Sequence, residues 1–131
     1  MTYRGDLILE SLSRPELLPR LVVAGVRRVP VMHGPALPRL ATWTLLSLEV
    51  EERDAAHDLA ITFGHAADPG HLGWYLDLLG DQEHLFAFLG RVFTVEATAA
   101  DDGYAEVVDF CVHRGIPADQ LDFRRLAPAA G

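Results

Sequence analysis

The stretch from residue 73 to residue 96 constrains the fold of this chain most, because its pattern predicts three consecutive short strands. Apolar and aromatic residues occupy 74–79, 84–88 and 91–95, and polar residues separate the first two runs. Gly90, between the last two runs, supplies the positive φ that a tight turn needs. We therefore expect an antiparallel meander here, and its five aromatic side chains place much of the core in it.

Three earlier strands are expected before this meander. Residues 6–12 and 21–32 are mostly apolar, and Pro30 places the end of the second run at a sheet edge or a bulge, because proline cannot donate to a ladder. Residues 43–51 alternate in the way a half-buried strand does. The side of that strand expected to face the core carries Leu46, Leu48 and Val50.

Two helices complete the pattern. The first is expected to begin at Asp54 as N-cap and to end at Asp68-Pro69-Gly70. Its apolar stripe is Ala56, Leu59, Ala60, Phe63 and Ala67. The second is expected to begin at Asp101 or Asp102 and to end at Gly115. Its stripe is Tyr104, Val107, Val108, Cys111 and Val112.

The order strand-strand-strand-helix-meander of three strands-helix predicts an α+β fold. We expect an antiparallel sheet with the two helices packed on one face, an arrangement similar to a ferredoxin-like fold with extra strands. A length of 131 residues suits a single domain spanning residues 1–131. Residues 126–131 are expected to form a frayed tail.

Composition excludes several classes of function. The single cysteine allows no intramolecular disulfide, and the absence of lysine excludes a P-loop or Schiff-base lysine. A net charge of −8 argues against nucleic acid as a partner. Without a signal-peptide pattern or an apolar run of about 20 residues, we expect a cytoplasmic protein that does not bind membranes.

Charge is distributed unevenly along the chain. Residues 1–41 carry a net charge of +3, and residues 42–131 carry −11. Solvation of the surface by acidic side chains is one explanation. The other is a polar molecule that pairs head to tail with a second copy or presents a basic edge to an acidic partner.

Four short patterns together resemble a group of small uncharacterised proteins from GC-rich bacteria. They are Trp43-Thr44-x-Leu46, Gly73-Trp74-Tyr75-x-Asp77, Phe88-x-Gly90-Arg91-Val92-Phe93 and Gly115-Ile116-Pro117-x-x-Gln120-Leu121-Asp122-Phe123. The absence of lysine and asparagine, whose codons are A/T-rich, agrees with such a source. The resemblance implies a stand-alone domain and carries no activity or site.

The candidate ligand-binding residues are Tyr75, Asp77, Arg91 and His33. Asp77 stands in an apolar run, where a lone carboxylate is costly unless it is paired. If Arg91 reaches it, the pair is structural. If Tyr75, Asp77 and Arg91 instead line the sheet face opposite the helices, they form a polar cluster beside aromatics, which is typical of ligand pockets.

The sequence gives less support to a metal site or to a nucleophilic catalytic residue. His65, Asp68 and His71 lie around the end of the first helix, but their spacing matches no established metal signature, so we expect no metal and no cofactor. Cys111 lies on an expected apolar stripe, which indicates a packing role.

The leading hypothesis for function is a non-enzymatic module that binds a protein partner or associates with itself, for example as a homodimer. One alternative is a small-molecule-binding protein or small enzyme with a pocket on the sheet face. Another is an acidic inhibitor or immunity-type protein that acts on a basic surface. A concave cavity with converging polar groups would favour the pocket, and a flat sheet face covered by another chain would favour the module.

Overall fold

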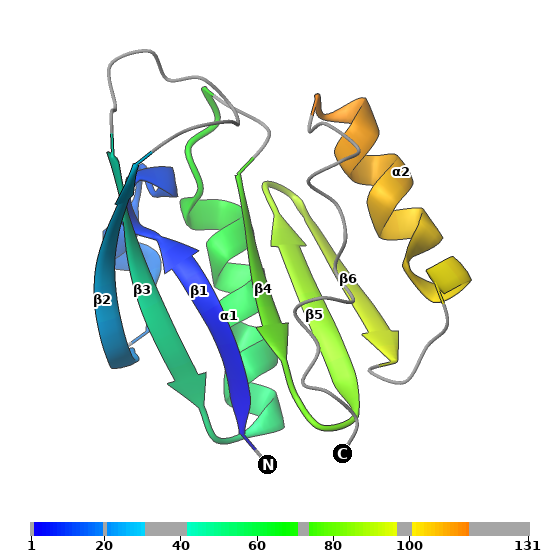
Figure 1. Cartoon of the computed structure of the whole chain (residues 1–131), viewed down its shortest axis with the longest axis horizontal. Helices are drawn as coiled ribbons and strands as arrows, with labels where there is room; N and C mark the ends of the chain where they lie inside the picture. Colours follow the sequence, from blue (N-terminus) through cyan, green and yellow to red (C-terminus); the bar gives the residue numbers. More distant parts are fainter. Residues whose placement is uncertain (1, 20, 31–41, 71–73, 97–100, 116–131) are drawn as a thin grey trace.

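The computed structural model describes residues 2–19, 21–30, 42–70, 74–96 and 101–115, which form a six-stranded antiparallel sheet with two α-helices (Figure 1). The predicted α+β class and the predicted order of strands and helices are confirmed. The elements are β1 (Tyr3–Ile8), β2 (Val22–Pro30), β3 (Thr42–Val50), α1 (Arg53–Ala66), β4 (Tyr75–Leu79), β5 (Glu83–Phe88), β6 (Arg91–Glu96) and α2 (Ala105–His113), with short 3₁₀ turns η1 (Leu9–Ser11), η2 (Pro15–Leu17) and η3 (Asp101–Tyr104).

The strands lie in the order β2-β3-β1-β4-β5-β6. Because β1 is antiparallel to both of its neighbours, β3 and β4 run parallel to each other, and α1 makes the crossover between them. A β-α-β unit with one strand inserted in the middle is the split unit of ferredoxin-like folds. The insertion brings the first strand of the chain to the centre of the sheet.

One face of the sheet packs against α1. The whole predicted stripe of the helix is buried there, and so is Leu48 on the predicted core face of β3. Leu76 and Leu78 of β4 face the same side. This cluster is the larger core of the domain.

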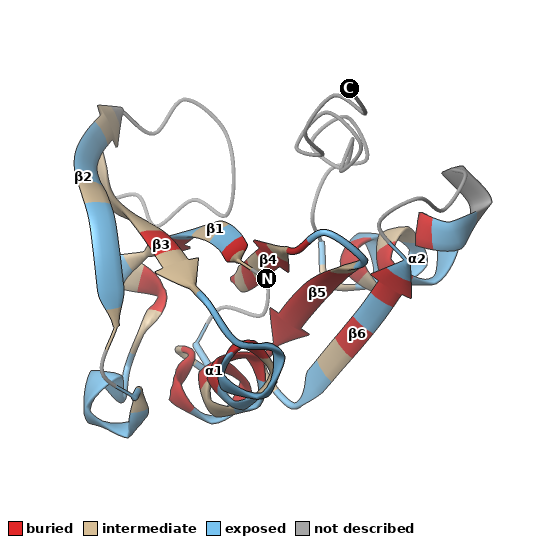
Figure 2. Ribbon diagram, turned by 90° about the horizontal axis from the view of Figure 1, so that it is seen from below, coloured by how far each residue is buried: buried red, intermediate tan, exposed pale blue. Residues whose placement is uncertain are grey.

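The prediction that both helices cover one face is wrong. Figure 2 shows α1 and α2 on opposite sides of the sheet. Leu85 and Ala87 of β5 pack with α1, whereas the alternate residues Phe86 and Phe88 pack with the segment from Tyr104 to Cys111. Residues 85–88 of β5 are all apolar because a strand that is covered on both faces needs no polar side.

Several element ends also differ from expectation. The first strand begins at Tyr3 rather than Asp6 and gives way to η1. The residue before α1 is Glu52, so Asp54 lies in the first turn. Gly90 and Gly115 have φ angles of 78° and 84°, as their expected turn and helix-end positions require. The predicted tail at 126–131 lies outside the described residues.

β2 is an edge strand, as Pro30 predicts, with a register shift between Val23 and Gly25. No helix among the described residues is both long enough and apolar enough to cross a bilayer.

Candidate functional site

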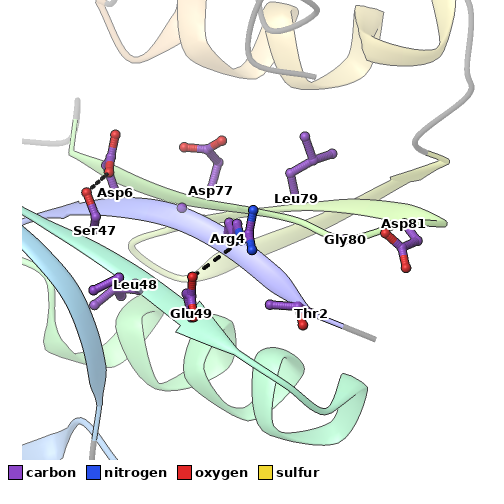
Figure 3. A pocket seen from close by; sticks show the side chains of 12 residues that line it. Thr2, Arg4, Asp6, Ser47, Leu48, Glu49, Asp77, Leu79, Gly80 and Asp81 are labelled. Carbon is purple, nitrogen blue, oxygen red and sulfur yellow. Dashed lines mark hydrogen bonds and ion pairs between the residues drawn. The ribbon is translucent and has the colours of Figure 1, made fainter. Parts of the chain in front are cut away.

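The face of the sheet that turns away from α1 carries a polar hollow of about 720 Å³ (Figure 3). β1, β3 and β4 form its floor, with contributions from β2 and from the turn after β4. Its polar lining is Thr2, Arg4, Asp6, Ser47, Glu49, Asp77 and Asp81. The converging polar groups come from segments far apart in the sequence.

The carboxylates of Asp6 and Asp77, which come from neighbouring strands, both line this hollow. Arg4 of β1 pairs with Leu79 of β4, and Asp6 and Asp77 each lie two residues from this pair, toward the same end of the two strands. The strands approach closely here, since a Cβ on Gly5 would collide with the Asp77 carbonyl oxygen. Figure 3 shows both acidic side chains on the side of the sheet away from α1.

Asp6 has two partners on the other side. Ser47 Oγ donates a hydrogen bond of 3.0 Å to Asp6 Oδ1, and Arg27 Nη2 lies 3.5 Å from Asp6 Oδ2. Arg4 forms a second ion pair, 3.5 Å from Glu49. Both arginine side chains are more than half exposed, so each ion pair contributes little and can rearrange.

Asp77 has a different kind of partner. His84 Nε2 lies 2.8 Å from Asp77 Oδ2, and the His84 side chain is fully buried. The other ring nitrogen, Nδ1, lies 3.4 Å from the hydroxyl of Tyr104, at the start of α2. The ring of Phe86 packs 4.2 Å from the His84 ring, centroid to centroid. A chain of polar contacts thus runs from the hollow through the interior to the second helix.

The structure places the residues predicted from sequence in three different settings. Tyr75 lies on the same face as Asp77, with its ring 5.6 Å from that of Phe88, and burial raises the pKa of its hydroxyl, with the charge of Asp77 and Cys111 adding to the effect. Arg91 Nη2 lies 3.1 Å from Glu106, so this arginine pairs with α2. His33 lies outside the described residues.

The candidate metal ligands are not gathered into a centre among the described residues, where no group of three or more His, Cys, Asp or Glu side chains could hold a metal ion. His65 is exposed, and Asp68 accepts a hydrogen bond from the backbone N–H of Gly70. His71 lies outside the described residues. Cys111 is buried, and burial raises the pKa of its thiol to about 12.

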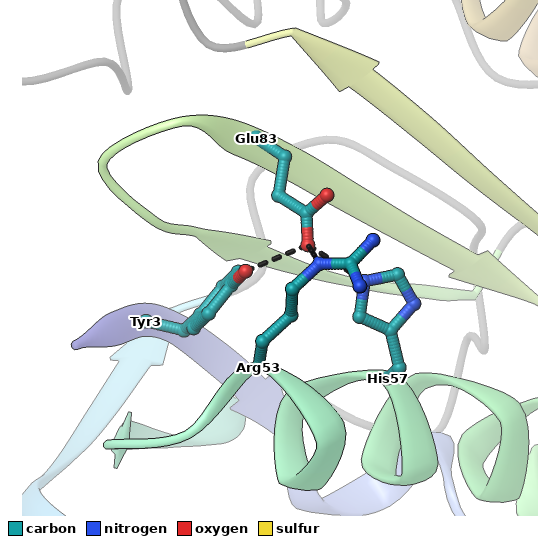
Figure 4. A network of polar contacts seen from close by, with 4 residues as sticks. All are labelled: Tyr3, Arg53, His57 and Glu83. Carbon is teal, nitrogen blue, oxygen red and sulfur yellow. Dashed lines mark hydrogen bonds and ion pairs between the residues drawn. The ribbon is translucent and has the colours of Figure 1, made fainter. Parts of the chain in front are cut away.

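A second polar cluster, on the α1 side, was not predicted from sequence (Figure 4). Glu83 Oε1 accepts hydrogen bonds from Tyr3 at 2.6 Å and Arg53 at 3.2 Å, and His57 Nε2 lies 2.6 Å away. Burial alone would raise the pKa of Glu83, but the Tyr3 and His57 hydrogen bonds and the charges of His57 and Arg53 together lower it. The cluster joins β1, β5 and α1.

The signal for this second cluster is weak in the sequence, because its members come from three separate elements. The hollow is similar in this respect: Asp77 stands out as a carboxylate in an apolar run, but nothing in the sequence near Asp6 indicates that the two acids line one hollow.

Comparison with known proteins adds no assignment: no family model, no curated protein and no solved structure matches this chain.

Proposed function

We propose that this protein is a non-enzymatic binding module whose hollow holds a positively charged nitrogen group. The observation that carries the proposal is the acidic lining of a concave site, which includes Asp6 and Asp77. A cation bound there would complement the excess of acidic side chains in the lining.

The surroundings of the pair support a polar, cationic ligand. Glu49 and Asp81 add two further acidic side chains to the lining, against one arginine, Arg4. The ion pairs of Arg4 and Arg27 are exposed, so an incoming cation can displace them at small cost. Hollows with a few converging polar groups are the usual form of a ligand site.

The cation has two possible sources with the same chemistry. It is either the amine or guanidine of a small molecule, or a lysine or arginine side chain on a basic protein partner. The second source would make the protein an acidic inhibitor or immunity-type module. An enzyme that uses the two carboxylates for acid–base chemistry would need the same residues, and turnover rather than simple binding would reveal it.

Titration followed by amide NMR tests the proposal. The probes are butylamine and butylguanidine, each with butylurea as its neutral control, and a pair of blocked tripeptides, Gly-Lys-Gly and Gly-Arg-Gly. We expect saturable shifts at Asp6, Ser47 and Asp77 with at least one cationic probe and none with butylurea. Saturation by the butyl probes indicates a small molecule, and saturation by the peptides alone indicates a protein partner.

Variants make the result specific. Asp6→Asn and Asp77→Asn should each abolish saturation, whereas Asp58→Asn, at an exposed position on α1, should leave it unchanged. Cation binding that survives both carboxamide variants would place the site elsewhere and contradict the proposal.

Association through β2 is a second candidate function. Val22 and Val26 of this edge strand are 65% and 62% exposed, which is unusual for valine in a strand. Exposed strand edges pair readily with another chain. The register shift near Val23 and the two arginines of β2 limit such pairing, so this candidate ranks second.

A further inference from the structure

The outer edge of β2 has no partner strand among the described residues (Figure 1). Such an edge presents backbone N–H and C=O groups to which a strand of another chain can add. Its apolar side chains are also open to solvent, since Val23, between the exposed Val22 and Val26, is itself 42% exposed. The directions of these side chains decide which strand can fit.

Two valines of β2 lie on the α1 face of the sheet. Directly opposite residues of an antiparallel pair have their side chains on the same face. Val23 pairs with Leu48, which is buried in the core beneath α1. Val26 pairs with Leu46, which packs against the same core.

Four positions of β2 lie on the other face, where the hollow is. Ala24 lines the hollow itself, and Arg27 forms an ion pair with a residue that lines it. Val22 and Gly25 pair with β3 residues that also line it. The register shift between Val23 and Gly25 therefore places two consecutive positions, Ala24 and Gly25, on one face.

A second copy can add to this edge as an antiparallel strand about a two-fold axis. A register fits only if the residues that meet lie on the same face. An axis between Ala24 and Gly25 meets this condition along the whole stretch from Val22 to Arg27. The pairs across that axis are Val22 with Arg27, Val23 with Val26, and Ala24 with Gly25.

Other axes fit less well. An axis at Ala24, Gly25 or Val26 sets residues of opposite faces against each other. An axis at Arg27 sets two arginines directly opposite each other, which is unfavourable. The register shift thus narrows self-pairing of this edge to one register.

That register also matches apolar and charged side chains. Val23 of each copy meets Val26 of the other, which gives two cross-strand pairs of β-branched residues. Arg27 meets Val22 of the second copy, whose partner in β3 is Glu49. Arg27 already reaches Asp6, two strands away in its own sheet, so Glu49 of the second copy, two strands away on the other side, is also within reach. Opposite charges therefore approach twice across the two-fold axis.

We propose that β2 pairs with β2 of a second copy about a two-fold axis between Ala24 and Gly25, so that two six-stranded sheets become one. The inference rests on the second candidate function, association through β2, and names the partner as a second copy of this chain. It does not depend on the cation proposed for the hollow.

Light scattering over concentrations from about 1 µM to about 1 mM measures the association. The interface of two short strands is small, so we expect a weak dimer with a dissociation constant on the order of 100 µM. Val26→Lys should raise this constant at least about tenfold, whereas Val112→Lys, at an exposed valine of α2, should leave it unchanged. Circular dichroism verifies that both variants are folded. A single-chain mass at every concentration would overturn the inference, and a dimer unaffected by Val26→Lys would also overturn association through β2.

Mixed cysteine variants test the register. Residues that meet on neighbouring strands have Cα atoms about 4.5–5.5 Å apart, within the range of a disulfide. Under oxidation by copper phenanthroline, Val23→Cys and Val26→Cys should each stay uncrosslinked alone, and their equimolar mixture should form a disulfide-linked dimer. Cys111 is buried and does not compete. Crosslinking of either variant alone, or none in the mixture, would overturn the proposed register, while loss of the dimer in Val26→Lys would still support association through β2.

Discussion

Replacing Tyr3 with phenylalanine removes one hydrogen bond from the Glu83 cluster and leaves the ring in place (Figure 4). Tyr3 is fully buried, and a Cβ on Gly80 would lie 2.7 Å from its ring, so the ring is closely covered and has no room to move. The substitution therefore tests the hydrogen bond rather than the packing of β1.

The size of the effect follows from the partners of Glu83. A hydrogen bond to a charged group contributes about 1.5–3 kcal/mol. Glu83 keeps His57 and Arg53 as partners, so the carboxylate is not left unpaired and the lower end applies. We expect a loss of about 1.5 kcal/mol in the free energy of unfolding near pH 7. With a urea dependence of about 1.5 kcal/mol per M, the midpoint should fall by about 1 M.

The loss should depend on pH because the pKa of Glu83 is lowered from its ordinary value of 4.5 in the folded protein. A lowered carboxyl pKa contributes stability that is fully present above the unfolded value and disappears as the pH falls through the folded value. Once Glu83 is protonated, Tyr3 makes only a neutral hydrogen bond, worth about 0.5–1 kcal/mol. The difference between the two proteins should therefore be smaller at a pH well below 4.5 than near pH 7.

Urea unfolding followed by circular dichroism at both pH values measures these quantities. Arg53→Gln is the matched control: its side chain is 61% exposed, so its loss should cost about 0.5 kcal/mol or less. A Tyr3→Phe midpoint shift below about 0.3 M near pH 7, or one of equal size at both pH values, would refute the reasoning.

Three further outcomes are expected. Phe88→Ala should cost about 4 kcal/mol in urea unfolding, because this buried ring contacts Tyr75, Phe93 and Phe110; a cost below about 1 kcal/mol would mean that this core is not formed. Cys111 should resist a thiol reagent until the protein unfolds, since burial raises its pKa to about 12; rapid native labelling would contradict its burial. If β2 mediates association, Val26→Lys should reduce the mass in light scattering to the single-chain 14.4 kDa, and an unchanged oligomer would rule out the β2 edge.

Much of the fold follows from local patterns. The alternation in β3 predicts its buried side correctly, and the helical spacing of α1 predicts a stripe that is entirely buried. The position of Gly90 between two apolar runs predicts its positive φ. Each of these signals lies within about ten residues. Over that range the geometry of a helix or strand alone determines on which face each side chain lies.

The side on which α2 packs could not be read in this way. The strand it covers is β5, and an apolar run such as residues 84–88 suits a strand buried on either one face or both. The stripe of α2 shows that the helix needs a partner surface, but both faces of β5 are apolar enough to provide one. Only the full sheet, with α1 already occupying the other face, decides between them.

The two acids of the hollow show where local reasoning stops. The sequence indicates that Asp77 needs a partner, and the partner lies within the same hairpin: Leu79 pairs with His84, which makes His84 the diagonal neighbour of Asp77. Hairpin register could therefore have identified His84 in preference to Arg91. Asp6 is different, because it lines the same hollow as Asp77 only when β1 inserts between β3 and β4, a pairing across more than seventy residues. The cation site that we propose thus depends on a long-range step of the topology, and a single sequence contains no local signal for it.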